Sequence, residues 1–160
     1  MSQDPVYKIR CGRRDFLALT GAGMVAAVAG TIFPGKVFAT VDDATAMISK
    51  ITGGAAAEQA KITFDLPQIA ENGNTVPVTV TVDHAMTDSS YIDTIHLIAE
   101  RNPAPEVADF HLTPSSGMAQ VSIRMRLAKT QNIVAVARGN DGKFYIAKQE
   151  IKVTIGGCGG

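Results

Sequence analysis

The residue best suited to chemistry is Cys158, which stands between two glycine pairs, Gly156-Gly157 and Gly159-Gly160. Glycine has the widest backbone freedom and loses the most entropy on ordering, so we expect this segment not to pack on its own domain. Cys158 is the third residue after Ile155, which gives a reach of about 10 Å at ~3.3–3.6 Å per residue. The pattern predicts a thiol carried on a flexible arm, residues 156–160.

Such a thiol fits a covalent handle better than an active site. A catalytic cysteine needs a base and oxyanion donors held around it, and a mobile glycine segment supplies neither. A carrier thiol must leave its own surface and enter sites of other proteins, where neighbouring side chains would block a narrow channel. We therefore predict no catalytic residue, covalent attachment at Cys158, and a carrier arm formed by Gly156, Gly157, Gly159 and Gly160.

Other roles for this end of the chain remain open. Cys158 could form a disulfide between two copies, and the terminal Gly-Gly could act like the thiocarboxylate of a ubiquitin-like carrier. A lone thiol is a poor zinc site, and His84, His96 and His111 match no metal-ligand spacing, so we expect no metal. His96 and His111 fall opposite the apolar strand faces, which predicts that they are surface residues.

Composition places the chain among globular proteins. It has 160 residues, of which 46% are hydrophobic and 19% charged, and its formal net charge is zero. Without a basic field, nucleic acid is not an expected partner. The two cysteines are Cys11 and Cys158, and removal of an N-terminal signal would leave Cys158 without a partner in its own chain.

Residues 1–39 have the order of a cleaved export signal. Arg13-Arg14-Asp15-Phe16-Leu17 resembles the twin-arginine pattern, with Arg13, Arg14, Phe16 and Leu17 as its matching residues. A mildly apolar run rich in Ala, Gly and Val follows, and Val37-Phe38-Ala39 suits a signal peptidase. We expect twin-arginine export to the periplasm and no membrane attachment after cleavage. The alternatives are an ordinary secretory signal with a chance arginine pair and a retained anchor.

The next segment predicts a short helix. Ala44, Met47, Ile48 and Ile51 recur at helical spacing on one face, Asp42 or Asp43 can cap the start, and Gly53-Gly54 ends it.

Beyond the helix, apolar residues alternate with polar ones, which predicts about seven strands. Pro77 suggests that its strand lies at a sheet edge or begins with a free N–H side, whereas residues 133–137 are apolar on both faces and predict a central strand. The alternation changes phase near Gln149-Glu150, which predicts a bulge or a change of sheet there. The expected strands cover residues 62–66, 76–82, 95–99, 108–112, 121–127, 133–137 and 143–155.

Together these elements predict an all-β, immunoglobulin-like antiparallel β-sandwich over residues 40–155, with a short N-terminal helix and a flexible C-terminal arm. The spacing of the strands leaves no helices between them, which argues against a parallel α/β sheet. Asn140-Asp141-Gly142 predicts a hairpin turn.

The Gly-Gly-Cys-Gly-Gly segment resembles that of the SoxY family, sulfur carriers of bacterial thiosulfate oxidation. Residues 67–73 with Val76-Pro77-Val78, and residues 102–110 with Asn102-Pro103, resemble its early and middle regions. The resemblance implies a heterodimer with a SoxZ-like β-sandwich subunit and loading of Cys158 with thiosulfate by the haem protein SoxAX. It also implies release of sulfate by the hydrolase SoxB, further oxidation by a sulfane dehydrogenase where present, and a carrier that is no enzyme and holds no cofactor.

Three hypotheses follow for the whole chain. The leading one is a periplasmic sulfur carrier. The second is an exported structural β-sandwich subunit cross-linked through Cys158, and the third is a thiol enzyme. The carrier predicts sulfur adducts on the protein. The structural subunit predicts a reducible dimer, and the thiol enzyme predicts turnover by the isolated chain.

Overall fold

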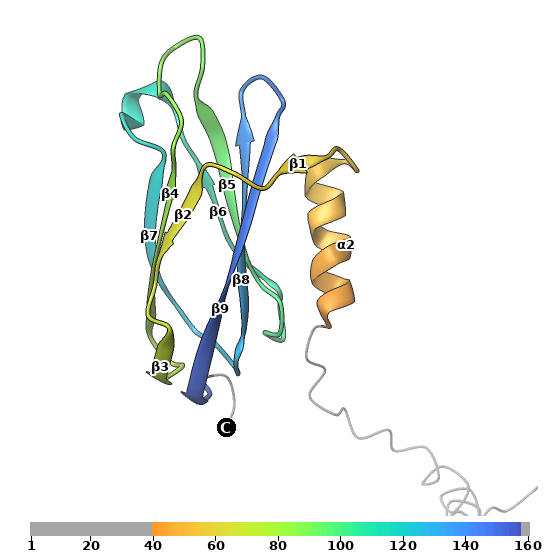
Figure 1. Cartoon of the computed structure of the whole chain (residues 1–160), viewed down its shortest axis with the longest axis vertical. Helices are drawn as coiled ribbons and strands as arrows, with labels where there is room; N and C mark the ends of the chain where they lie inside the picture. Colours follow the sequence, from red (N-terminus) through yellow and green to blue (C-terminus); the bar gives the residue numbers. More distant parts are fainter. Residues whose placement is uncertain (1–39, 158–160) are drawn as a thin grey trace, which may run out of the picture. The chain divides into compact units, whose positions relative to one another are not determined.

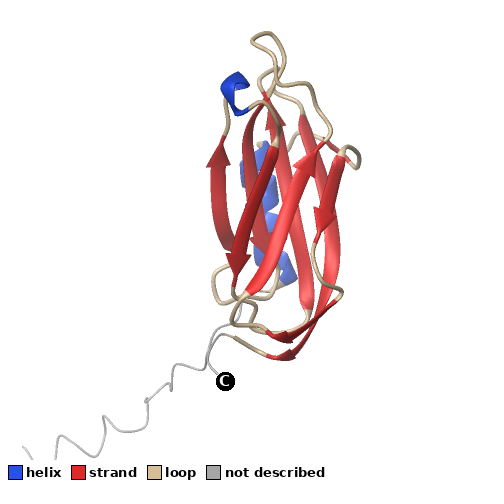
Figure 2. Ribbon diagram, turned by 90° about the vertical axis from the view of Figure 1, so that its left-hand side faces the viewer, coloured by secondary structure: helices blue, strands red, loops and turns tan. Residues whose placement is uncertain are grey.

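The computed structural model describes residues 40–157, so the predictions for residues 1–39 and 158–160 lie outside this part. Two β-sheets face each other, and one helix packs on the outer face of the larger sheet (Figures 1 and 2). Nothing helical within residues 40–157 has the length and apolar composition to span a bilayer.

Nine strands and a short 3-10 helix, η2 (Pro114–Ser116), follow the α-helix α2 (Val41–Thr52) in the described part. The larger sheet has the order β1-β9-β8-β5-β6, with β3 pairing beside β1 on β9, and the smaller sheet has the order β2-β4-β7. The predicted β-sandwich is confirmed. The strands are β1 (Ala57–Glu58), β2 (Ile62–Asp65), β3 (Ile69–Asn72), β4 (Val76–Val82), β5 (Ile92–Ala99), β6 (Glu106–His111), β7 (Gln120–Met125), β8 (Gln131–Gly139) and β9 (Phe144–Ile155).

Two strands were not predicted, β1 and β3. They have two and four residues, too few to display a clear alternation. Both pair parallel to β9, whereas the other strand pairs are antiparallel. The mainly antiparallel arrangement therefore includes two short parallel additions along one edge of β9.

The core lies between the sheets and confirms the predicted inward faces. Val76, Val78, Val80 and Val82 of β4 are buried, as are residues 133–137 of the central strand β8. The edge position suggested by Pro77 is wrong, because β4 is the middle strand of its sheet. Pro77 is tolerated because pairing with β2 begins two residues later, at Thr79, which leaves that side of the proline free.

The α-helix α2 covers the second face of β8. Ala44 is buried, and Met47, Ile48 and Ile51 pack with it against apolar side chains of β5, β8 and β9, which confirms the predicted apolar face of the helix. Gly53 ends the helix with a left-handed φ of 62°. The predicted cap is wrong: Thr40 is the N-cap, and its hydroxyl accepts a hydrogen bond from the Asp43 backbone N–H at 3.3 Å.

Asp43 completes this capping box and makes it sensitive to acid. Its carboxylate accepts hydrogen bonds from the Thr40 backbone N–H, at 2.7 Å, and hydroxyl, which lower the pKa of Asp43 below its ordinary value. A carboxylate with a lowered pKa in the folded state contributes stability above its unfolded pKa, near 4, and loses it as the pH falls through the folded pKa.

We expect Asp43→Ala to lower the urea midpoint at pH 7, and the difference from the wild type to shrink on acidification to below about pH 3. Urea unfolding of both proteins at the two pH values measures this. Asp42→Ala, in the same helical turn, is the control. An Asp43→Ala effect of equal size at both pH values would contradict the capping role.

The apolar side chains change faces along β9, but the predicted bulge is not the cause. Pairing with β8 runs without a shift from Arg138↔Phe144 to Gln131↔Ile151. Tyr145 and Ile151 face the sandwich core, whereas Phe144 and Ile146 pack with α2 on the opposite face. The apolar pattern switches because the helix covers only the first part of β9. Beyond Ile151, the strand gains β3 as a neighbour.

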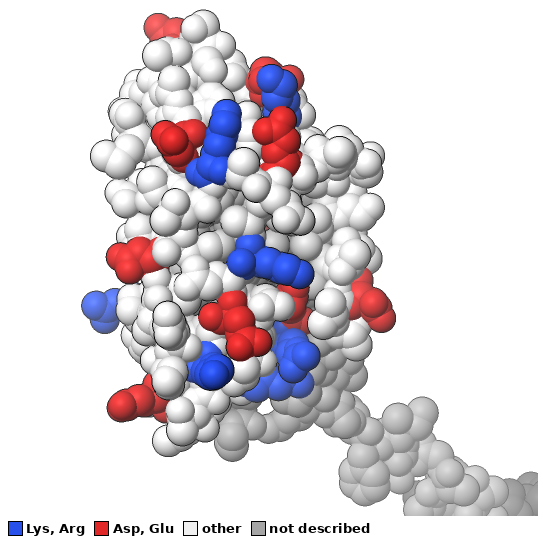
Figure 3. Space-filling model, in the orientation of Figure 1, with Lys and Arg blue, Asp and Glu red and all other residues white. Residues whose placement is uncertain are grey.

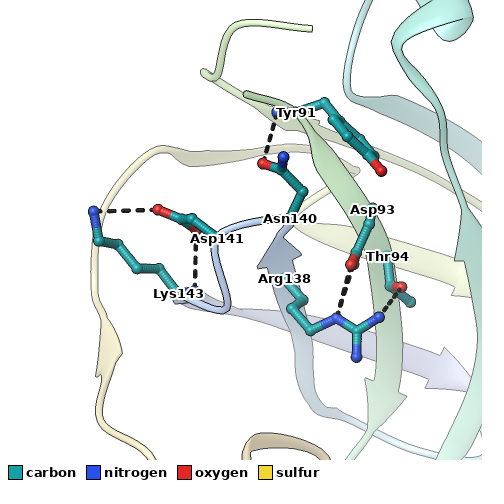
Figure 4. A network of polar contacts seen from close by, with 7 residues as sticks. All are labelled: Tyr91, Asp93, Thr94, Arg138, Asn140, Asp141 and Lys143. Carbon is teal, nitrogen blue, oxygen red and sulfur yellow. Dashed lines mark hydrogen bonds and ion pairs between the residues drawn. The ribbon is translucent and has the colours of Figure 1, made fainter. Parts of the chain in front are cut away.

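The predicted hairpin turn at residues 140–142 joins β8 to β9 and carries a polar network (Figure 4). Arg138 Nε lies 2.9 Å from Asp93 Oδ1, and this hydrogen-bonded ion pair raises the pKa of Arg138. The backbone N–H of Lys143 donates to Asp141 at 3.1 Å and lowers the pKa of that carboxyl. These contacts stabilise the start of β9, at the end of the strand opposite the arm.

Candidate functional site

The part of the arm that the structure describes ends at Gly157. Cys158, Gly159 and Gly160 lie outside the described residues, as do Arg13, Arg14, Phe16 and Leu17. The structure therefore defines the base of the arm. There β9 ends at Ile155 and is followed by Gly156 and Gly157, the two glycines before Cys158.

Strand β9 leads directly to the arm. Its last residues lie beside β3, in the parallel register Ile69↔Lys152, Ala70↔Val153 and Asn72↔Ile155. The Val153 backbone N–H donates to the Thr130 hydroxyl at 2.9 Å. These contacts hold the end of β9 in place, so that the arm leaves from one defined point at the end of the sandwich (Figure 1).

Gly156 and Gly157 are not free, which corrects the prediction that the arm begins at residue 156. Both are half-buried. The Gly157 N–H donates to the Leu127 carbonyl at 2.8 Å, the Leu127 N–H donates to the Gly73 carbonyl at 2.8 Å, and the Gly73 N–H donates to the Ile155 carbonyl at 2.7 Å. The first two arm glycines therefore continue the backbone pairing of the sandwich.

Close backbone packing explains why glycine occupies these positions. A Cβ at Gly156 would overlap the carbonyl of Ala128, and one at Gly157 would overlap the carbonyl of Gly73. A Cβ at the buried Gly73 would overlap the carbonyl of Leu127. We call these five residues, Gly73, Leu127, Ala128, Gly156 and Gly157, the arm-base contact.

The buried side-chain amide of Asn102 supports the arm-base contact. Asn102 is 8% exposed, and its Nδ2 donates to the Arg126 carbonyl at 2.8 Å. Its Oδ1 accepts from the Ala128 backbone N–H at 3.0 Å and from Gln131 Nε2 at 2.9 Å. The side chain thereby fixes the segment that joins β7 to β8, against which the arm glycines lie.

Replacing Asn102 should therefore loosen the arm base. We expect Asn102→Ala to lower the free energy of unfolding by about 1–3 kcal/mol, because it leaves the Ala128 N–H and the Gln131 amide without their partner. Urea unfolding measures this. Asn140→Ala is the matched control, since Asn140 also bonds to backbone groups but is exposed, and its expected cost is about 0.5 kcal/mol. Equal costs would argue against Asn102 as a buried support.

Exposed basic residues flank the arm base. Arg101 precedes Asn102, Arg126 precedes Leu127, and Lys152 lies on β9; all three side chains are exposed. Glu71 of β3 is the acidic residue nearest in sequence to Gly73 and is also exposed. Figure 3 shows Lys and Arg side chains in the lower half of the sandwich, interspersed with Asp and Glu.

The histidines are placed apart from the arm-base contact. His111 is exposed, as predicted. His96 is not a freely exposed residue: its side chain is 17% exposed and its Nδ1 lies 2.6 Å from Asp109. Met47, Lys50 and Ile51 of α2 line the same pocket as His96, because α2 covers this face. Within residues 40–157, no group of three His, Cys, Asp or Glu side chains could hold a metal ion.

The structure also contains a cavity of about 410 Å³, lined by residues of α2, of the segment before β2 and of β8 and β9. None of its lining residues belongs to the arm-base contact. Sequence reasoning missed Gln131, Leu127 and Ala128 as parts of the site, and it used Gly73 and Asn102 only for the resemblance to the family. The sequence carries no local indication of these contacts, since the residues come from three separate segments.

Comparison with known proteins agrees with this geometry. The family described as "Sulfur oxidation protein SoxY" matches residues 48–158, a range that includes the arm-base contact and Cys158. Among solved structures, the chain is similar to the sulfur carrier protein SoxY from Chlorobium limicola f thiosulfatophilum, with 36% identity and a TM-score of 0.59. The match covers 72% of this chain and 100% of that one.

Other solved structures share the fold alone. Superoxide reductase (neelaredoxin) from Ignicoccus hospitalis is 22% identical, with a TM-score of 0.53, over 72% of this chain and 94% of its own. A putative superoxide reductase from Thermotoga maritima is 20% identical, with a TM-score of 0.51, over 60% of this chain and 87% of its own. No match is found among curated proteins.

Proposed function

Because the chain belongs to the SoxY family of sulfur oxidation proteins, we propose that it is a periplasmic sulfur carrier whose Cys158 covalently holds intermediates derived from thiosulfate. Membership of the family supports a carrier role in sulfur oxidation. The observation that carries the finer proposal is the position of Cys158 one residue beyond a backbone contact that fixes where the arm leaves the sandwich.

The proposed loading step is an oxidation. The sulfane sulfur of thiosulfate forms an S–S bond with the Cys158 sulfur, the thiol loses its proton, and two electrons pass to a haem protein of the SoxAX type. The product is a cysteine S-thiosulfonate, which carries one negative charge. Hydrolysis by a SoxB-type enzyme then breaks the bond to the sulfonate group with water, releasing sulfate and a proton and leaving a persulfide on Cys158.

The surroundings of the arm base suit an anionic adduct. Exposed Arg101, Arg126 and Lys152 offer positive charge near the point where the arm begins, and opposite charges attract most where solvent screening is incomplete. None of these side chains adjoins Cys158 in sequence, which leaves the activation of the thiol to the partner enzymes. The proposal therefore makes this protein a substrate of those enzymes and not an enzyme itself.

The proposed partners follow from the family. They are a SoxZ-like β-sandwich subunit as the second member of a heterodimer, SoxAX for loading, SoxB for release of sulfate and a sulfane dehydrogenase where present. Twin-arginine export through Arg13, Arg14, Phe16 and Leu17 would bring the carrier to the periplasm, where residues 1–39 are removed. The carrier itself holds no cofactor.

The experiment that tests the proposal is intact-mass analysis of the protein purified from cells grown on thiosulfate. We expect a fraction of the chains to be heavier by one sulfur atom or by one thiosulfonate group, with the added mass on the peptide that contains Cys158. Reduction by dithiothreitol should remove it. A reducible dimer without sulfur adducts would instead support the structural, cross-linked subunit and contradict the carrier.

A further inference from the structure

We propose that the arm-base contact acts as a closed latch, with Gly157 as the pivot from which Cys158 extends, and that this latch sets the reach of the thiol. Gly156, Gly157 and Gly73 are then positioning residues for Cys158. The placement of the pivot stands on the structure, whereas its consequence for sulfur transfer rests on the proposed function. The contact joins three segments that are distant in sequence, around residues 73, 127 and 157.

The hydrogen bonds of the contact form a continuous series. Three of its backbone N–H groups donate to carbonyls: Gly157 to Leu127, Leu127 to Gly73, and Gly73 to Ile155, at 2.7–2.8 Å. Breaking one of these hydrogen bonds exposes backbone polar groups of the next segment, so the bonds stabilise one another. Gly73 is buried and Leu127 is 0% exposed, which places the body side of the latch in a well-packed part of the sandwich.

Glycine is required at the latch for a reason other than mobility. A side chain at Gly156 or Gly157 would meet backbone carbonyl groups, which cannot move aside like the end of a flexible side chain. The two glycines before Cys158 therefore have a role different from the two after it. The first pair docks on the sandwich, and Gly159-Gly160 follow the thiol.

The latch changes how far the thiol extends. With the latch closed, one peptide unit of about 3.8 Å separates Gly157 from Cys158. With the latch open, the free segment starts at Ile155 and extends three residues, or about 10 Å at ~3.3–3.6 Å per residue. The proposed latch therefore shortens the reach of the thiol in the free carrier, and a deep partner site is reached only when the latch opens.

Substitutions on either side of the latch test this proposal. In the full chain carrying Cys11→Ser, so that Cys158 is the single thiol, a nitroxide attached to Cys158 reports the motion of the arm. We expect a partly restricted spectrum in this parent protein and a clearly more mobile one in Gly157→Ala and in Gly73→Ala. Nuclear magnetic resonance should show that the Gly157 amide of the parent exchanges at least about tenfold more slowly than an unstructured amide. Gly73→Ala should remove this protection.

Gly159→Ala is the matched control, because it adds the same methyl group to the arm beyond the latch. We expect it to leave the exchange of the Gly157 amide unchanged. The urea midpoint of each variant shows that its sandwich is folded. A Gly157 amide that exchanges at the unstructured rate in the parent protein overturns the proposal. So does a spectrum that neither latch variant changes.

These measurements need no thiosulfate and no partner enzyme. If the Gly157 amide is protected and the latch variants free the nitroxide, but the protein never acquires sulfur adducts, the proposed function is refuted and the pivot at Gly157 remains. If Cys158 acquires adducts but neither the amide exchange nor the nitroxide spectra show the latch, the pivot is refuted and the carrier function remains.

Discussion

Cys158→Ser is expected to abolish the sulfur adducts completely and to stop any thiosulfate oxidation that depends on this protein. Serine replaces the sulfur by oxygen, which cannot form the S–S bond of the proposed intermediate. The substituted atom lies beyond Gly157, the last residue with a described contact to the sandwich, so the urea midpoint should remain that of the wild type. Intact-mass analysis and sulfate release in a reconstituted thiosulfate-oxidising mixture measure the two effects.

Cys11→Ser is the matched control for this experiment. It removes the other cysteine of the chain from the segment that we expect to be cleaved, so adduct formation and sulfate release should match the wild type. Sulfate release that still depends on the Cys158→Ser protein would refute the carrier function. Loss of folding in this variant would contradict the expectation that residue 158 adds nothing to the stability of the sandwich.

Replacing both Arg13 and Arg14 by lysine is expected to block export, so that most of the protein remains in the cytoplasm as the uncleaved precursor. Lysine keeps the positive charges but lacks the planar guanidinium with its five fixed donors, so it is a poor substitute where geometry matters. Cell fractionation and the size of the product on a gel measure the effect. The chain should still fold, because the helices and strands described here lie within residues 41–155.

Arg10→Lys makes the same chemical change in the same segment but outside the arginine pair. Export of this variant should equal that of the wild type. If the Arg13→Lys, Arg14→Lys protein is exported and processed normally, the twin-arginine assignment is wrong and the ordinary secretory route is supported. Retention of the wild-type protein in the membrane with residues 1–39 intact would instead support the anchor.

Much of the fold could be predicted from the sequence because side-chain periodicity is a local property. Four alternating valines determined the inward face of β4, and the spacing of Ala44, Met47, Ile48 and Ile51 determined which face of α2 is buried. Each pattern depends on neighbours within a few residues, which share one backbone conformation. Such patterns do not say which strands become neighbours.

The predictions from sequence were wrong where a second layer of the structure, or a segment distant in sequence, affects a local pattern. Phe144 and Ile146 suggested a bulge together with Ile151, yet the strand is regular and α2 covers the first two side chains. Asp42 or Asp43 was expected to cap the helix because acidic residues often do so, but Thr40 precedes them and Asp43 closes the capping box instead. Two short strands went undetected because their positions depend on β9.

For the candidate site, the sequence alone indicated Cys158 as the candidate reactive residue, the glycines around it and the family, since these depend on residue type and order. Only the tertiary structure decided that Gly156 and Gly157 are docked on the sandwich. The physical reason is that the absence of a Cβ permits two opposite outcomes, free motion or very close packing. Which of them occurs depends on whether another backbone comes near. Here the pairing of β3 with β9 brings Gly73 close, and Leu127 bonds to both Gly73 and Gly157.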